Sequence, residues 1–103
     1  MSGRRESRAA TRHFVKVEAA IRERGSSFRF SIDVVDMSAT GFRCESSFKL
    51  RPGQEVTIIF PGLQPLDAKV AWAEEFRYGF QFLRPLHDAV FQHLAQRFSR
   101  PPR

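Results

Sequence analysis

The chain has 103 residues, of which 42% are hydrophobic and 27% charged, a balance typical of a single globular domain. Its formal net charge of +6 favours an anionic partner such as a nucleotide, a nucleic acid or an acidic surface. No apolar stretch approaches the roughly 20 residues of a membrane helix, and the basic N-terminus lacks the apolar segment of a secretory signal. The lone Cys44 cannot form an internal disulfide, so we expect a cytoplasmic protein without a membrane partner.

The first twelve residues are polar and basic, with arginines at positions 4, 5, 8 and 12. They show no hydrophobic periodicity, so we expect residues 1–12 to form a flexible basic arm. Apolar and polar residues then alternate in six short stretches separated by turn residues, which favours an antiparallel barrel or sandwich. The expected strands cover residues 15–21, 28–34, 42–45, 56–60, 66–72 and 78–82.

The hydrophobic period changes towards the C-terminus. Apolar residues from Leu86 to Phe98 recur every four positions, which predicts an amphipathic helix that ends before Pro101. The expected fold is therefore mostly β, a six-stranded antiparallel β-barrel with a C-terminal α-helix and a flexible N-terminal arm. We expect the arm over residues 1–12, the barrel and helix over 13–100, and a short tail over 101–103.

The second expected strand runs into the sequence DMSATG, which brings an acid, a hydroxyl and a glycine close together. Alone, this is an ordinary turn, because Asp and Ser side chains bond local backbone groups. The arginine arm favours a ligand site instead, because guanidinium groups match phosphate oxygens and the O6/N7 edge of guanine. Asp36 complements the N1 and N2 donors of guanine, Ser38 both donates and accepts, and Gly41 lets the backbone approach a ligand closely.

An RxxxR pattern in a basic arm, followed by a hairpin and then DxSxxG, resembles the PilZ domain. The resemblance extends through LRPGQEVTIIF and AKVAWAEEFRYGFQF to the terminal helix, and so covers nearly the whole chain. It implies a six-stranded barrel of the PilZ type that binds the bacterial second messenger cyclic di-GMP. Carried onto this sequence, Arg8 and Arg12 would hold guanine edges and phosphates. Asp36, Ser38 and Gly41 would hold a guanine at the barrel surface.

The arginine motif has two possible registers. Arg4 and Arg8 have the same spacing as Arg8 and Arg12, and Arg8 belongs to both pairs. We prefer the second register, because Arg12 lies just before the first strand, as the second arginine of the family does. Ser7 stands where many members have an arginine, whereas here the Arg4–Arg5 doublet comes earlier. Arg4 and Arg5 are therefore ligand contacts of second rank.

Two residues of the expected barrel are further candidates of second rank. Trp72 shares its face with Val70 and Ala68, so we expect it to pack in the core. Trp72 is also the last aromatic residue of its strand, so the alternative is that its ring stacks on a base of the ligand. Arg43 is expected to face solvent, with a ligand contact as the less favoured interpretation.

The sequence contains neither a nucleophile–base pair nor histidines at metal-ligand spacing, so we expect no catalysis, no metal and no cofactor other than the ligand. The favoured function is a cyclic di-GMP receptor, a monomer or weak dimer, whose arm changes conformation and signals to an unidentified protein. One alternative is a nucleic-acid-binding barrel, which is less favoured because the basic residues concentrate in the arm. Another is a PilZ-like protein-interaction domain without a ligand.

Overall fold

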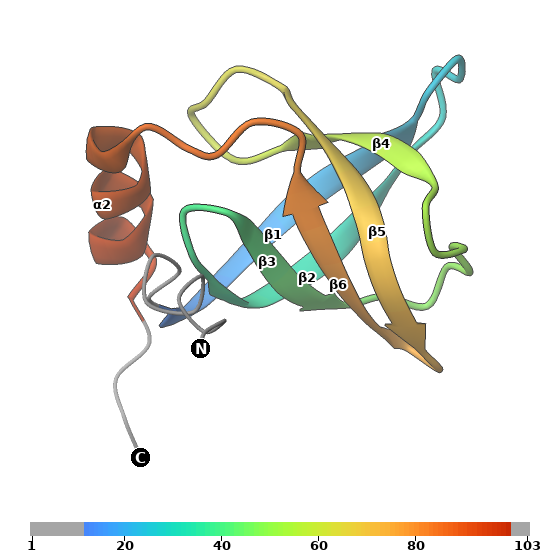
Figure 1. Cartoon of the computed structure of the whole chain (residues 1–103), viewed down its shortest axis with the longest axis horizontal. Helices are drawn as coiled ribbons and strands as arrows, with labels where there is room; N and C mark the ends of the chain where they lie inside the picture. Colours follow the sequence, from blue (N-terminus) through green and yellow to red (C-terminus); the bar gives the residue numbers. More distant parts are fainter. Residues whose placement is uncertain (1–11, 100–103) are drawn as a thin grey trace, which may run out of the picture.

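The computed structural model describes residues 12–99 and shows a closed antiparallel β-barrel with one helix beyond its last strand (Figure 1). Neighbouring strands follow the order β1-β2-β3-β6-β5-β4 around the barrel. The expected fold class is confirmed, and every expected strand is present with ends that differ by a few residues. The expected tail and the expected arm, apart from Arg12, lie outside the described residues. The strands are β1 (His13–Glu23), β2 (Arg29–Met37), β3 (Gly41–Glu45), β4 (Glu55–Ile59), β5 (Leu66–Glu74) and β6 (Arg77–Phe82).

Alternation of apolar and polar residues gives each strand one face for the core and one for solvent. Along β1, Val15, Val17, Ala19 and Ile21 are all buried, and the residues between them are mostly exposed. Aromatic rings fill much of the interior. The rings of Phe42 and Phe80 are stacked there, with their centroids 4.8 Å apart. Closing the sheet covers this core and leaves no unpaired edge. The outer wall is therefore the surface on which the barrel can carry a site.

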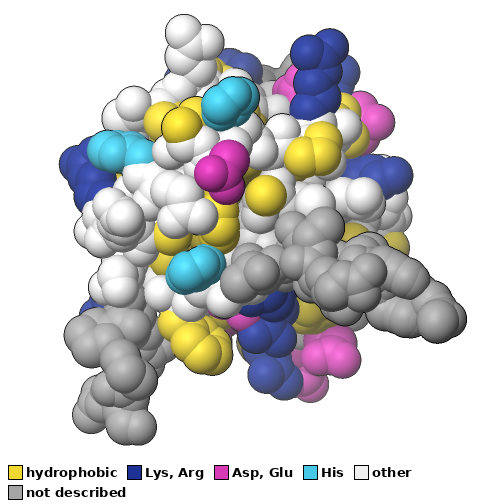
Figure 2. Space-filling view, turned by 60° about the vertical axis from the view of Figure 1, so that its left-hand side comes forward, with side chains coloured by type: hydrophobic (Ala, Val, Ile, Leu, Met, Phe, Trp, Pro, Cys, Tyr) yellow, Lys and Arg dark blue, Asp and Glu magenta, His cyan; other side chains and the backbone are white. Residues whose placement is uncertain are grey.

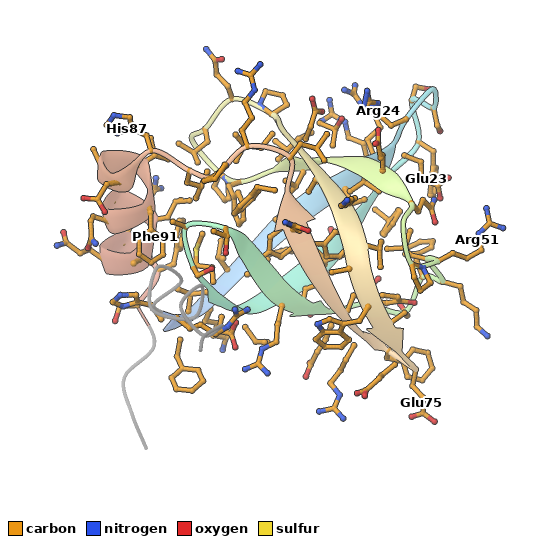
Figure 3. The ribbon with its side chains drawn as sticks, viewed as in Figure 1. Glu23, Arg24, Arg51, Glu75, His87 and Phe91 are labelled. Atoms are coloured by element: carbon orange, nitrogen blue, oxygen red, sulfur yellow. The ribbon has the colours of Figure 1, made fainter. Side chains whose placement is uncertain are left out.

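Helix α2 (Asp88–Arg97) covers one end of the barrel (Figure 1). His87 begins the helix, accepting a hydrogen bond from the backbone of Ala89 at its Nδ1 atom, and Phe91 points from the helix towards the strands (Figure 3). The predicted amphipathic helix is thus confirmed. Within residues 12–99, no helix is long and apolar enough to cross a membrane.

The chain beyond α2 returns to the start of β1. The backbone N–H of Lys16 donates to the carbonyl of Phe98 at 2.9 Å, and Val15 forms a bridge with Ser99. The His13 ring also lies edge-on to Phe91, with ring centroids 5.2 Å apart. These contacts fix the first residues of β1 against the end of the helix, and so they fix the position from which Arg12 extends.

Gly41 begins β3 at a point where the backbone of β6 leaves no room for a side chain. A Cβ atom at this position would collide with the backbone carbonyl oxygen of Phe80 and would lie 3.3 Å from the Cα atom of Gln81. Gly79 on β6 is also crowded, but there the obstacle is the movable indole side chain of Trp72. The two glycines therefore differ in how easily a methyl group can be accommodated.

We predict that Gly41→Ala lowers the free energy of unfolding by about 1–3 kcal/mol, because the strands themselves must move apart. Gly79→Ala is the matched comparison, and its loss should be smaller because the Trp72 ring can rotate away. Urea unfolding followed by circular dichroism measures both losses. Equal losses in the two variants would contradict this account of Gly41.

Candidate ligand-binding site

A β-bulge in β2 decides where the side chain of Asp36 points. Val34 pairs with Cys44 in the core, but the next pair along the two strands is Asp36 with Arg43, so Val35 has no partner on β3. Directly opposed residues on neighbouring strands project to the same face, and a bulge shifts that relation by one residue. Asp36 therefore projects with Arg43 onto the outer wall, whereas strict alternation from Val34 would have placed it inside.

The Asp36 carboxylate lies between two arginines and is only 1% exposed. Arg12 contacts the Oδ1 atom through Nε at 3.0 Å and through Nη2 at 2.9 Å. Arg43 donates from Nε to the Oδ2 atom at 2.6 Å, and its Nη2 contacts the same oxygen. Charge-assisted contacts with paired donors are among the strongest that a side chain makes. The buried negative charge is therefore compensated from both sides.

The bond to Asp36 also affects Arg43 itself. The hydrogen bond from Arg43 to the carboxylate raises the pKa of the guanidinium, with a smaller opposing effect of burial. Arg43 consequently keeps its positive charge at every physiological pH. The Arg43 side chain is 47% exposed, so it faces solvent as expected. Its guanidinium group nevertheless contacts Asp36.

One row of cross-strand pairs carries the site across the outer wall. Phe14 pairs with Asp36, Asp36 with Arg43, Arg43 with Gly79, and Gly79 with Trp72. Opposed residues share a face, so this row runs over β1, β2, β3, β6 and β5 on the outside of the barrel. Phe14 is 67% exposed at one end of the row and Trp72 is 38% exposed at the other.

The prediction that Trp72 packs in the core is wrong. The register shifts between Val70 and Trp72, so that Val70 pairs with Phe80 while Trp72 pairs with Gly79. Val70 stays buried, and the shift turns the indole onto the outer wall. The ring lies against Gly79, where any side chain would collide with its nitrogen atom. A glycine inside a strand is a sequence signal for such a close approach.

The row borders a shallow depression with a volume of about 350 Å³. Aromatic rings, arginines and carboxylates all contribute to its surface, so it can offer stacking, anion binding and hydrogen-bond acceptors together. The sequence analysis did not identify Phe14 and Arg77 as residues of this depression. The exposure of Phe14 could have been predicted, because the inward-facing residues of β1 are the odd-numbered Val15 and Val17. The lining residues are Phe14, Val35, Asp36, Arg43, Cys44, Glu45, Trp72, Glu74 and Arg77.

Ser38 and Gly41 build the turn that follows Asp36. The Ser38 side chain is fully buried, and its Oγ atom accepts from the backbone N–H of Thr40 at 3.2 Å and bonds with the Thr40 hydroxyl at 3.1 Å. Its backbone N–H donates to the carbonyl of Gly41 at 2.8 Å. The simple turn interpretation therefore describes Ser38, while Asp36 is engaged by arginines from other parts of the chain.

The structure thus brings together three of the predicted site residues, Arg12, Asp36 and Arg43, and places Trp72 in the same row. Arg4, Arg5 and Arg8 lie outside the described residues, and their predicted roles stay predictions.

Two other reactive residue types have ordinary surroundings. Burial raises the pKa of the Cys44 thiol to about 12, with a further contribution from the carboxylates of Glu45 and Asp33, so the thiol stays protonated and unreactive near neutral pH. The histidines seen on the helix-bearing face lie apart from one another (Figure 2). In the part of the chain between residues 12 and 99, no group of three or more potential ligands is placed to hold a metal.

The closed barrel thus carries an arginine–carboxylate cluster and exposed aromatic rings on its outer wall. The chain belongs to the PilZ domain family, whose model matches residues 4–99. PilZ domains are binding and regulatory domains, and the family is known for binding cyclic di-GMP.

The fold is similar to that of a solved member of the family. This is the crystal structure of the PilZ domain of CeSA from a cellulose-synthesizing bacterium, with a TM-score of 0.62 and 18% sequence identity. The match covers 84% of this chain and 92% of that one, so the likeness extends over most of the chain. A comparison with curated protein sequences yields no match.

Proposed function

We propose that this protein is a cyclic di-GMP receptor that binds its ligand on the outer wall, at the depression beside Asp36. The observation that carries the proposal is the buried Asp36 carboxylate, which is held in place by Arg12 and Arg43 next to an exposed aromatic ring. Membership of a family known for binding cyclic di-GMP supports the same ligand.

Each chemical group of the ligand has a complementary side chain in this proposal. Asp36 accepts hydrogen bonds from the N1 and N2 donors of a guanine, which adenine lacks. Arg8 and Arg12 bind phosphate oxygens and the O6/N7 edge of guanine. Trp72 provides a flat surface for stacking of a base. Ser38 and Gly41 contribute by holding the turn that presents Asp36.

Nucleic-acid binding is the second candidate, because the chain is strongly basic. The acidic residues that line the depression make nucleic-acid binding the less favoured function. Glu45 and Glu74 line the depression, and the charge of Asp36 offsets part of the charge on Arg12 and Arg43. Salt separates the two functions, because nucleic-acid affinity falls steeply with ionic strength through counterion release.

We predict that Arg8→Ala and Arg12→Ala each weaken binding of cyclic di-GMP by about 10- to 100-fold, the loss expected for one charge-assisted bidentate contact. Isothermal titration calorimetry of the folded variants measures the change. Arg29→Ala is the matched control, because it removes an exposed arginine at the other end of β2. Affinities near that of the wild type in both variants would contradict the Arg8/Arg12 register. Arg4→Ala would then test the Arg4/Arg8 register.

We predict that Asp36→Ala reduces the preference for cyclic di-GMP over cyclic di-AMP. The carboxylate is the acceptor for donors that guanine has and adenine lacks, so its loss removes the basis of discrimination. Titrations with both dinucleotides measure the ratio of affinities. Asp33→Ala, which removes an exposed carboxylate from the same strand, should leave that ratio unchanged. Full guanine preference in Asp36→Ala would show that Asp36 serves only the structure.

The proposed function includes a response of the arm, residues 1–12, that is transmitted to a separate and unidentified protein. Arg8 and Arg12 would be tied to bound phosphates, and their hydrogen bonds to the ligand must offset the conformational entropy that the arm loses. We predict that ligand increases the protection of the backbone amides of residues 4–14 against hydrogen exchange. Equal protection with and without cyclic di-GMP would contradict a role of the arm in signalling.

A further inference from the structure

Both oxygens of the Asp36 carboxylate are in contact with arginines, and the residue is only 1% exposed. A carboxylate presents about four lone-pair directions, two on each oxygen. Arg12 donates one hydrogen bond to the Oδ1 atom and Arg43 donates one to the Oδ2 atom, and the Nη2 atom of each arginine contacts the same oxygen, which leaves little room for another donor. A guanine that uses its N1 and N2 donors must therefore displace an arginine before it can bind Asp36.

The two arginines are not equally held. Arg12 precedes β1 and reaches Asp36 from outside the strand, with contacts of 2.9 and 3.0 Å. Arg43 lies within β3, directly opposite Asp36 in the strand ladder, and its Nε atom is 2.6 Å from the carboxylate. The raised pKa of Arg43 reflects the same strong bond. Arg12 is therefore the partner that can leave at the smaller cost.

We infer that Arg43 is the permanent counter-charge of Asp36, and that guanine takes the place of Arg12 alone. This inference rests on the proposed function and extends it to a residue that acts through Asp36. A buried carboxylate left without a cation is strongly unfavourable, so the exchange requires a second arginine that stays in place. The displaced Arg12 becomes available to the phosphates of the same ligand. Arg43 is thus a positioning residue that makes the exchange possible.

A double-mutant cycle tests whether Arg43 acts through Asp36. Arg43→Gln should weaken binding of cyclic di-GMP by about 10-fold or more and should narrow the preference over cyclic di-AMP. Arg43→Lys keeps the charge but not the paired donors, so it should recover part of both properties. In the Asp36→Asn background, Arg43→Gln should have little further effect, because its partner is already neutral.

Arg29→Gln is the control for the loss of one positive charge, since this residue lies at the other end of β2, and it should bind like the wild type. Calorimetric titration at one fixed ionic strength measures all of these affinities. An equal effect of Arg43→Gln with and without the Asp36 carboxylate would overturn the inference, because Arg43 would then contact the ligand directly. Unchanged affinity and selectivity in Arg43→Gln would overturn it as well.

A second measurement needs no ligand. Urea unfolding should show that Arg43→Gln raises the unfolding equilibrium constant about tenfold, whereas Arg12→Gln raises it only about threefold. The opposite order would overturn the role of Arg43 as the more firmly held partner. A wild-type protein that binds no cyclic di-GMP would overturn the proposed function and the exchange with it. The order of the unfolding constants would still decide which arginine is the resident partner.

Discussion

The site depends on a negative charge that is almost entirely removed from water. Isolated, a carboxylate as deeply covered as that of Asp36 would be costly, so its position requires cations close by. The chain supplies them from two places, the residue before β1 and the middle of β3. The fold must therefore bring the residue before β1 to the neighbouring strands β2 and β3 at one point on the outer wall.

Two bulges achieve this without disturbing the core. Val35 in β2 is left unpaired beside Asp36, and a similar register shift in β5 precedes Trp72. Each shift turns one side chain, Asp36 or Trp72, to the outside, while Val34 and Val70 stay buried. The helix end and its bond to Lys16 add a fixed starting point for β1. The charged cluster and the exposed indole then share one row of the sheet.

Alternation of apolar residues predicted the six strands, and the change to a four-residue period predicted the helix, because the buried face of each element is apolar. Alternation by itself was compatible with a barrel or a sandwich, and the structure is a closed barrel. The sequence predicted that Asp36 and Arg12 both contact the ligand, but it did not predict that they form an ion pair with each other. Alternation failed at Trp72, because a bulge changes the phase of a strand without changing its composition. The hydrogen bonds of Ser38 also could not be assigned in advance, since the same residue type serves turns and ligands equally well.

The row from Phe14 to Trp72 uses only outward-facing positions, and the core uses only the inward-facing ones. Substitutions on opposite faces of one sheet share few contacts, so their effects on stability and on recognition are largely independent. Substitutions in the outer row can consequently change the chemistry of that surface while the core stays the same. What stays constrained is the length of the chain at the two bulges, because one residue inserted or deleted there would exchange the faces.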